Sequence, residues 1–350
     1  MTIPVVDLSR RGAALAPALA DVAARIASSG TILLGPETAA FEREFARWAG
    51  AEAVVAVASG ATALQLALRA LGVGPGDEVI VPAMTAVPTA AAVCATGATP
   101  VFADVDPATV TLDPHAAAAV RTERTKVVIP VHLYGHPAAV PELADVDVLI
   151  DAAQAHGAVA EHAAVAAVAY SFYPTKNLGG IGDGGAVAVT DPALADRLRL
   201  LRGHGLTQDY VHTEISQNFR MSELEAAWLR LALPELASGN ARRAAIAAHY
   251  REAAPGLTWQ AAHPAHVYHL AVACVTDRPA FRETLAAAGV ATAMHYPRAL
   301  TQQPAYARFA AAPCPHAEAW AAGCVSVPCF PELTDAEVEH VAAALAKAQP

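Results

Sequence analysis

One lysine stands in a segment that otherwise contains mostly small and polar residues. The segment reads SFYPTKNLGGIGDGG at residues 171–185, and the lysine is Lys176. A lysine amine that is partly buried near other cations loses some of its proton affinity and can then attack an aldehyde to form a Schiff base. Taken alone, a solvated surface lysine is the commoner case, so the segment needs partners before it indicates catalysis.

Asp151 is the first such partner. It ends the apolar run VDVLID and opens the segment DAAQAHGA, which also contains Gln154 and His156. An acid at this point can cap a helix, bind a metal or hold the protonated pyridine nitrogen of pyridoxal 5'-phosphate (PLP), whose ring then accepts electrons from a carbanion. Taken alone, His156 is more typical of a structural histidine.

The second partner is a turn of small residues, Ser59-Gly60-Ala61-Thr62, between the apolar runs VVAVA and ATALQLALRAL. Such a turn exposes backbone N–H groups, and the start of a helix favours an anion such as a phosphate. An ordinary strand-to-helix turn with Ser59 as the N-cap explains the same residues. The residues alone leave both interpretations open.

Short apolar runs, alternating with helical stretches, must position these groups. The alternation predicts an α/β fold with a mostly parallel central sheet. Because ligands bind at the carboxyl ends of parallel strands, we expect Gly60, Asp151 and Lys176 to meet at that edge. The predicted strands are residues 54–58, 78–82, 100–105, 126–131, 146–151, 167–172 and 185–190.

The pattern changes after residue 190. Helices follow, and then a smaller α+β unit. We therefore expect a large domain at residues 1–235 and a smaller C-terminal domain at residues 236–350. The predicted elements are helices at 191–201, 221–255, 278–288 and 334–347, and a strand near 268–275.

Composition excludes several classes of protein. A net charge of −10 over 350 residues argues against a nucleic-acid or anionic-membrane partner. Five cysteines without a CxxC pair argue against a metal or disulfide framework. The uncharged stretch 79–103 is long enough to span a bilayer, but its prolines favour strand, helix and strand in a buried sheet. Without a signal peptide, a soluble cytoplasmic protein is expected.

Together the segments resemble those of the DegT/DnrJ/StrS-type sugar aminotransferases, which are PLP-dependent transferases of fold type I. The resemblance covers nearly the whole chain in the family's order. Besides 171–185 and DAAQAHGA, it includes LLGPETAAFEREFA (33–46), SGATALQLAL (59–68), GVGPGDEVIVPA (72–83), PVHLYGHPA (130–138), LRGHG (201–205), NFRMSELEAA (218–227), HYPRAL (295–300) and SVPCFPELTDAEVEHV (326–341).

The resemblance implies roles around the cofactor ring. Lys176 would carry PLP as a Schiff base and would shuttle protons. Asp151 would pair with the pyridine nitrogen, and Gln154 would contact the cofactor beside its ring oxygen. His295 and Tyr296 would lie near the sugar site or the domain interface.

It also implies a phosphate site shared between two subunits. Gly60, Ala61 and Ser171 would hold the phosphate, and Asn218 would reach it from the neighbouring subunit. The active unit would therefore be a homodimer. The threonine usual in the phosphate turn aligns with Ala61, so a hydroxyl is lost that Thr62 would have to replace.

Two further departures concern the ring and the loops. An aromatic residue often stacks on the PLP ring in this family, whereas Ala86 occupies the aligned position here. That ring face is then either covered by another residue or open to substrate. The stretches 137–151 and 157–167 are shorter than the family leads us to expect, which would weaken cofactor binding.

The implied reaction moves an amino group from L-glutamate or L-glutamine to a nucleotide-linked 3-keto or 4-keto deoxyhexose in amino-sugar biosynthesis. PLP and pyridoxamine 5'-phosphate (PMP) would alternate in two half-reactions. The alternatives are a ketocyclitol aminotransferase, a PLP-dependent sugar dehydratase and a non-catalytic member that binds PLP or sugar. Lys176 argues against a dehydratase, whose lysine is usually replaced by histidine. Lys176 and Asp151 together argue against a non-catalytic protein.

Overall fold

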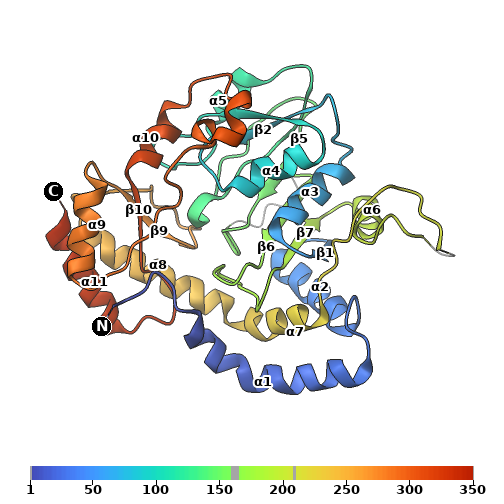
Figure 1. Ribbon diagram of the computed structural model, residues 1–350, viewed down its shortest axis with the longest axis horizontal. Coiled ribbons are helices and arrows are strands. Elements are labelled where there is room, and N and C mark those ends of the chain that lie inside the picture. Colours follow the sequence, from blue (N-terminus) through green and yellow to red (C-terminus); the bar gives the residue numbers. More distant parts are fainter. Residues whose placement is uncertain (1, 159–164, 208–209, 350) are drawn as a thin grey trace.

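A seven-stranded sheet forms the centre of the protein in a computed structural model, which describes residues 2–158, 165–207 and 210–349 (Figure 1). Its strands are β1 (Ala53–Val57), β2 (Glu78–Pro82), β3 (Thr99–Ala103), β4 (Thr125–Val128), β5 (Asp147–Asp151), β6 (Ala167–Ser171) and β7 (Gly185–Val189). Their order is β1-β7-β6-β5-β4-β2-β3, and only the pairs that include β7 are antiparallel in this described part. The predicted α/β fold with a mostly parallel sheet is confirmed.

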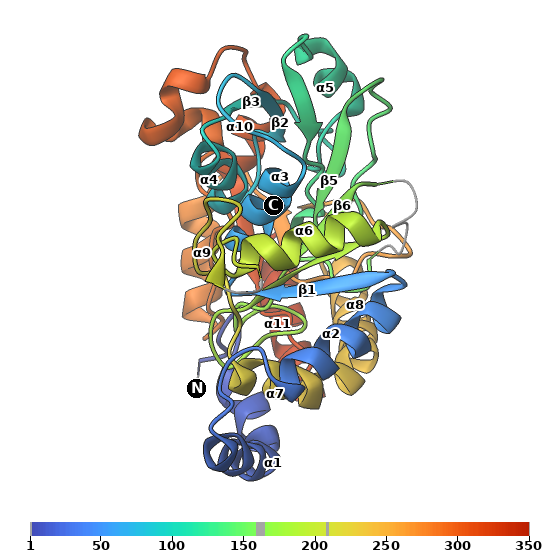
Figure 2. The same cartoon turned by 90° about the vertical axis from the view of Figure 1, so that its right-hand side faces the viewer.

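Helices cover the sheet: α2 (Pro36–Ala49), α3 (Gly60–Ala70), α4 (Val87–Ala95), α5 (Pro114–Val120), α6 (Pro192–Arg202) and α7 (Glu223–Ala232). Because β2, β6 and β7 bury every residue, both sheet faces need apolar cover. Val55 faces a core that includes residues of α3, α4 and α6, and Val54 faces one that includes residues of α2 and α7. Figure 2 shows β1 between α6 and α2.

A second, antiparallel sheet lies in the C-terminal part. It has the order β10-β9-β8, with strands β8 (Thr258–Trp259), β9 (Ala271–Cys274) and β10 (Cys324–Val327). Helices α8 (Leu236–Ala253), α9 (Arg278–Ala287) and α11 (Asp335–Ala348) share its core, which also contains Ile3. Trp320 of α10 (Pro315–Gly323) packs instead into the core of the large sheet. A domain boundary near residue 236 stays a prediction, because Val272 of β9 and Cys324 of β10 also pack into the core of the large sheet.

Two helical regions differ from the sequence-based expectation. No pattern indicated α1 (Leu8–Ser29), because most of its residues are exposed and its apolar stripe is narrow; Leu15 and Leu19 pack against the core near α7. The helix predicted over 221–255 is interrupted by a 3₁₀ turn, Leu233–Glu235, between α7 and α8. Pro234 explains the interruption, because proline lacks the backbone N–H and its ring clashes with the preceding turn.

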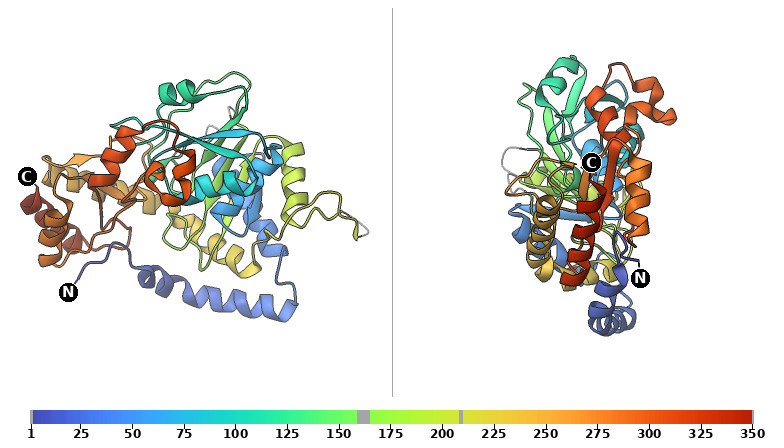
Figure 3. Two further views of the ribbon diagram at one scale, coloured as in Figure 1. Left: turned by 45° about the horizontal axis from the view of Figure 1, so that its top comes forward. Right: turned by 90° about the vertical axis from the view of Figure 1, so that its left-hand side faces the viewer.

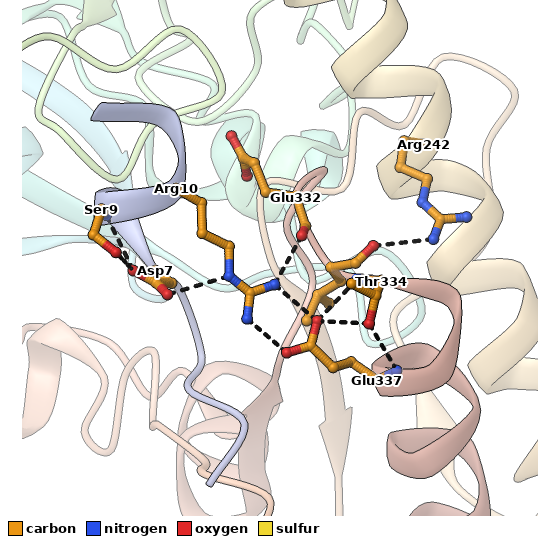
Figure 4. A network of polar contacts seen from close by, with 8 residues as sticks. Asp7, Ser9, Arg10, Arg242, Glu332, Thr334 and Glu337 are labelled. Carbon is orange, nitrogen blue, oxygen red and sulfur yellow. Dashed lines mark hydrogen bonds and ion pairs between the residues drawn. The ribbon is translucent and has the colours of Figure 1, made fainter. Parts of the chain in front are cut away.

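The first turn of α1 is tied to the C-terminal helix. Arg10 donates to both carboxylate oxygens of Glu337, at 2.7 and 2.6 Å, and to the carbonyl of Glu332 at 2.8 Å (Figure 4). From there α1 runs along the outside of the molecule towards α2 and α7 (Figures 1 and 3). The neighbouring Arg11 donates from Nη1 to the carbonyl of Lys176 at 3.4 Å, so the same turn also reaches the lysine loop.

The uncharged stretch 79–103 folds as β2, α4 and β3 of the large sheet, as its prolines predicted. Strand β2 lies between β4 and β3, and β3 is the edge strand of the sheet, so the stretch does not form one long apolar helix. Within the described residues, no helix has both the length and the apolar character needed to cross a membrane.

Candidate active site

The carboxyl edge of the sheet brings the predicted residues together. Asp151 ends β5 and Ser171 ends β6, its neighbour in the sheet. Gly60 begins α3 directly after β1, and a Cβ atom on Gly60 would lie 2.4 Å from the Cβ of Ser171. Lys176 follows one short turn after β6, where its N–H donates to the carbonyl of Tyr173 at 2.8 Å. The close approach to Ser171 explains why residue 60 has no side chain.

Lys176 and Asp151 interact electrostatically in a buried place. The Lys176 residue is partly exposed, but its amino group is buried. Burial lowers the pKa of Lys176 to about 8, although the charge of Asp151 acts in the opposite direction. Burial raises the pKa of Asp151, against its hydrogen bonds and the charge of Lys176. The amine therefore gives up its proton more readily than a solvated lysine does.

Asp151 is held by groups on both of its carboxylate oxygens. The backbone N–H of Ala153 donates to Oδ1 at 3.0 Å, and the Thr89 hydroxyl donates to Oδ2 at 2.8 Å. Thr89 is fully buried on α4, and its hydroxyl is 3.2 Å from that of Thr85. No pattern in the sequence pointed to Thr89, because a threonine in an apolar helix attracts no attention until the fold places it beside an acid.

The turn after β1 has the features of both interpretations, an ordinary helix cap and a candidate phosphate-binding turn. Ser59 is the N-cap of α3, and its hydroxyl accepts from the N–H of Thr62 at 3.1 Å. The Thr62 hydroxyl is engaged in the same cap, donating to the carbonyl of Ser59 at 2.8 Å. The first turn of a helix leaves its leading N–H groups without intrahelical acceptors, here those of Gly60 and Ala61. Those groups, close to Ser171, can hold a phosphate, while the Thr62 hydroxyl serves the cap.

Gln154 is fixed from both ends of its amide. Its Oε1 accepts from the backbone N–H of Tyr134 at 2.7 Å, and its Nε2 donates to the hydroxyl of Tyr296 at 3.0 Å. The Tyr134 hydroxyl donates to the carbonyl of His295 and accepts from Trp320 Nε1 at 3.2 Å. The segment PVHLYGHPA, which contains Tyr134, is part of the family resemblance, but no role was predicted for Tyr134 from the sequence.

His295 and Tyr296 therefore lie next to Gln154 and Tyr134, and their placement near a sugar site stays a prediction. The ring of His295 is 2.8 Å from the Ser326 hydroxyl through Nδ1. Burial, together with the charge of Lys176, lowers the pKa of His295 to about 4. The imidazole is therefore neutral near neutral pH and can exchange hydrogen bonds without adding charge to the site.

Asn218, Ala86 and His156 differ from the residues described above in their position or their surroundings. Asn218 is exposed, and its Oδ1 accepts from Arg220 Nε at 2.9 Å rather than from a group of the site in this chain. Ala86 is the half-exposed N-cap residue of α4 and makes no side-chain cap. His156 is enclosed by the rings of Tyr170 and Phe172, at centroid distances of 5.5 and 5.6 Å, as a structural histidine would be. Of the short stretch 157–167, residues 159–164 lie outside the described residues.

The fold and this constellation define a transferase of the PLP-dependent aminotransferase class. Residues 16–346 match the DegT/DnrJ/EryC1/StrS aminotransferase family, and the chain belongs to that family. The resemblance seen in the sequence is thereby confirmed.

Two relatives are similar over nearly their whole length. An erythromycin biosynthesis sensory transduction protein, EryC1, of Saccharopolyspora erythraea is 43% identical, with 99% of each chain covered. A dTDP-3-amino-3,4,6-trideoxy-α-D-glucose transaminase of Streptomyces venezuelae is 44% identical, with 95% of this chain and 92% of the relative covered.

Two crystal structures share the fold. DesV of S. venezuelae, solved in complex with a ketimine intermediate, has a TM-score of 0.94 and 41% identity over 100% of this chain and 99% of that one. NtdA of Bacillus subtilis, solved with its bound cofactor PMP, has a TM-score of 0.91 and 26% identity over 99% of this chain and 85% of that one.

The first prediction concerns Thr89, which we expect to hold Asp151 in position. Thr89→Val keeps the shape of the side chain but removes the donor to Oδ2. Losing a hydrogen bond to a charged group costs about 1.5–3 kcal/mol. The dissociation constant for PLP should therefore rise about ten- to a hundredfold. Absorbance titration of the apo-protein measures it. Thr85→Val is the matched control, and equal losses in the two variants would contradict the role of Thr89.

The second prediction concerns the protonation of Lys176. Only the neutral amine attacks an electrophile. Because the pKa of Lys176 is lowered to about 8, its labelling by trinitrobenzenesulfonate in the apo-protein should rise through that pH. Mass spectrometry of the labelled peptide gives the profile, and the exposed Lys347 is the internal reference. A Lys176 profile that coincides with the Lys347 profile would show that burial does not activate the amine.

Proposed function

We propose that this protein is a PLP-dependent aminotransferase that moves an amino group from L-glutamate or L-glutamine to a nucleotide-linked keto sugar. The observation that carries the proposal is the buried amine of Lys176 beside Asp151, at the edge where Gly60 meets Ser171. A reactive amine, a carboxylate and an anion-binding turn are the three groups that a phosphorylated pyridine aldehyde requires.

The residues present fit this cofactor. Asp151, held by Thr89 and Ala153, would face the pyridine nitrogen, and Gln154 would lie beside the ring oxygen. The N–H groups of Gly60 and Ala61 and the hydroxyl of Ser171 would hold the phosphate. When bound, PLP supplies an electron sink that stabilises negative charge on the Cα of the donor.

Lys176 would do the acid–base work. Its Nζ takes the proton from the Cα of the donor in one half-reaction and returns a proton to the acceptor carbon in the other. One group that serves as base and acid in turn needs a pKa near the working pH. The lowered pKa of about 8 suits that double role.

A nucleotide-linked 3-keto or 4-keto deoxyhexose is the proposed acceptor, and the names of the relatives favour amination at C3. The S. venezuelae relative is named for a dTDP-linked 3-amino-3,4,6-trideoxyglucose. Its identity of 44% extends over 95% of this chain, which supports a similar substrate class.

A regulatory role is the second candidate, because the relative EryC1 is named as a sensory transduction protein. Such a role needs binding but no proton transfer. Two features of this chain favour catalysis: Lys176 is present with a lowered pKa, and Asp151 is held by donors on both oxygens. A lysine with a pKa near 8 can both bind the aldehyde of PLP and transfer protons, and proton transfer is the step that a purely regulatory protein would not need.

The active unit would be a homodimer in which each subunit completes the site of the other. Asn218 follows a segment in which the apolar side chains of Tyr210 and Ile215 are 86% and 94% exposed. Ile32, before α2, is 60% exposed. Apolar groups this open indicate a surface that a partner covers, and a second copy of the chain would bring Asn218 towards the phosphate turn of its partner.

The third prediction tests the reaction. Purified protein with PLP should show an absorption band at longer wavelength than the protein without PLP. Borohydride should remove this band and attach the cofactor covalently to the Lys176 peptide. With ¹⁵N-glutamate and a dTDP-linked keto sugar, label should appear in the sugar. Lys176→Ala should lower transfer by at least about 10²–10⁴-fold, as for loss of a general base. Cofactor binding without label transfer to keto sugars or ketocyclitols would favour the regulatory role, and loss of water from the sugar would indicate a dehydratase.

The fourth prediction tests the shared site. Lys176→Ala and Asn218→Asp, in separate chains carrying different tags, should each give an inactive homodimer, because aspartate would repel the phosphate. The purified heterodimer has one site with both residues intact, so it should recover about half of the wild-type activity per dimer. If Asn218 served its own chain, both sites of the heterodimer would be damaged and it would stay inactive.

A further inference from the structure

A buried carboxyl group lies directly behind the loop that carries Lys176. Glu225 projects from α7 and is only 4% exposed. Its Oε2 accepts a hydrogen bond from the backbone N–H of Gly182 at 2.9 Å. Its Oε1 is buried, and among the described residues it has no hydrogen-bond partner. An acid in such a place is unusual, because burying a carboxyl group costs free energy unless hydrogen bonds or a paired charge replace its lost hydration.

The glycines of the loop leave room for this carboxyl group. A Cβ atom on Gly180 would lie 1.5 Å from the Oε1 of Glu225, and one on Gly184 would lie 3.2 Å from it. Neither glycine has a positive φ, so the backbone conformation does not require glycine there. The close approach of Glu225 does require it, since any side chain on Gly180 would collide with the carboxyl group.

The loop is closed at its base, so its two limbs cannot move independently. Phe172 donates its N–H to the carbonyl of Gly184 at 2.7 Å and accepts from the N–H of Gly180 at 2.6 Å. Lys176 lies on the outgoing limb, and Glu225 holds Gly182 on the returning limb. On the next turn of α7, Trp228 Nε1 donates to the carbonyl of Gly179 at 2.9 Å. Helix α7 therefore fixes the returning limb at two points.

We propose that Glu225 is a positioning residue for the amino-group transfer: its carboxyl group, seated among glycines, fixes the returning limb of the loop and so keeps Lys176 facing Asp151. The proposal rests on the proposed function for its catalytic meaning, while the positioning itself is a property of the apo-protein. Glu225 would touch neither cofactor nor substrate. Its effect reaches Lys176 through the backbone, because the base of the loop at Phe172 joins both limbs.

The raised pKa of Glu225 indicates that its carboxyl group acts through its hydrogen bond rather than through a negative charge. Burial raises the pKa of Glu225 to about 7, and the charge of Asp183 acts in the same direction, whereas the N–H groups of Gly182 and Ile181 oppose them. A neutral glutamine could accept from Gly182 equally well. The acceptor should therefore matter more than the ionised state.

The test compares three variants. Glu225→Gln keeps the length and the acceptor, and Glu225→Leu removes the acceptor. Leu229→Ala, one turn further along α7, is the matched control, since Leu229 is fully buried in the core and makes no polar contact. Hydrogen exchange of residues 179–184 and trinitrobenzenesulfonate labelling of Lys176 are measured on the apo-proteins, and the dissociation constant for PLP by absorbance. Thermal denaturation reports the stability of each variant.

We expect Glu225→Leu to speed exchange in 179–184 and to raise the dissociation constant for PLP about tenfold, because the partly buried N–H of Gly182 loses its acceptor. Glu225→Gln should stay within about threefold of the wild type. Leu229→Ala should lose stability without either change. The proposal is overturned if Glu225→Gln behaves like Glu225→Leu, if exchange in 179–184 is unchanged, or if Leu229→Ala matches Glu225→Leu in PLP affinity. A wild type that binds no PLP would refute the proposed function, while exchange and labelling would still test the positioning.

Discussion

The buried pair of Lys176 and Asp151 is the constraint on which the site depends. Burial disfavours the charge of both residues, and each charge favours that of the other. The pair is therefore sensitive to small changes in separation and solvation. The pKa of Lys176, near 8, reflects burial that lowers it and the charge of Asp151 that raises it, so the position of the loop relative to the end of β5 affects both contributions. Much of the surrounding structure can be understood as the means of keeping that position.

Glycines allow the segments around Lys176 and Asp151 to pack closely at positions where a side chain would not fit. Gly60 lets the start of α3 press against Ser171, and Gly180 admits the carboxyl group of Glu225. Gly185 works in the same way at the start of β7, where a Cβ atom would lie 2.2 Å from the carbonyl of Ser59. These contacts join the phosphate turn, the end of β6 and the lysine loop into one packed unit. Displacing one of the three would disturb the others, because their close contacts leave little space between them.

Local signals were sufficient to predict the α/β class and the edge of the sheet where Gly60, Asp151 and Lys176 lie, whereas their roles towards a cofactor came from the family resemblance and stay predictions. Apolar runs predicted the strands, and Gly60, Asp151 and Lys176 follow strand ends, where a parallel sheet must collect them. Thr89 and Tyr134 were missed because their roles arise from contacts with residues 62 and 20 positions away in the chain. The direction of β7 was not predicted either, since an apolar run reads alike in both directions. The break at Pro234 could have been predicted from the proline alone.

If Ala86 takes the place of the ring-stacking aromatic residue of the family, it would change how the free energy of cofactor binding is distributed. Stacking on that face would then contribute little, and contacts to the pyridine nitrogen and the phosphate would have to contribute more. Helix α4 serves the first of these needs: Ala86 begins it, and three residues later Thr89 donates to Asp151. The N–H groups at the start of α3 serve the second. In that arrangement a small residue at position 86 would also leave space above the ring, where a nucleotide-linked sugar would approach without displacing a side chain. Strong contacts at the two ends of the cofactor and an open face between them would then depend on each other.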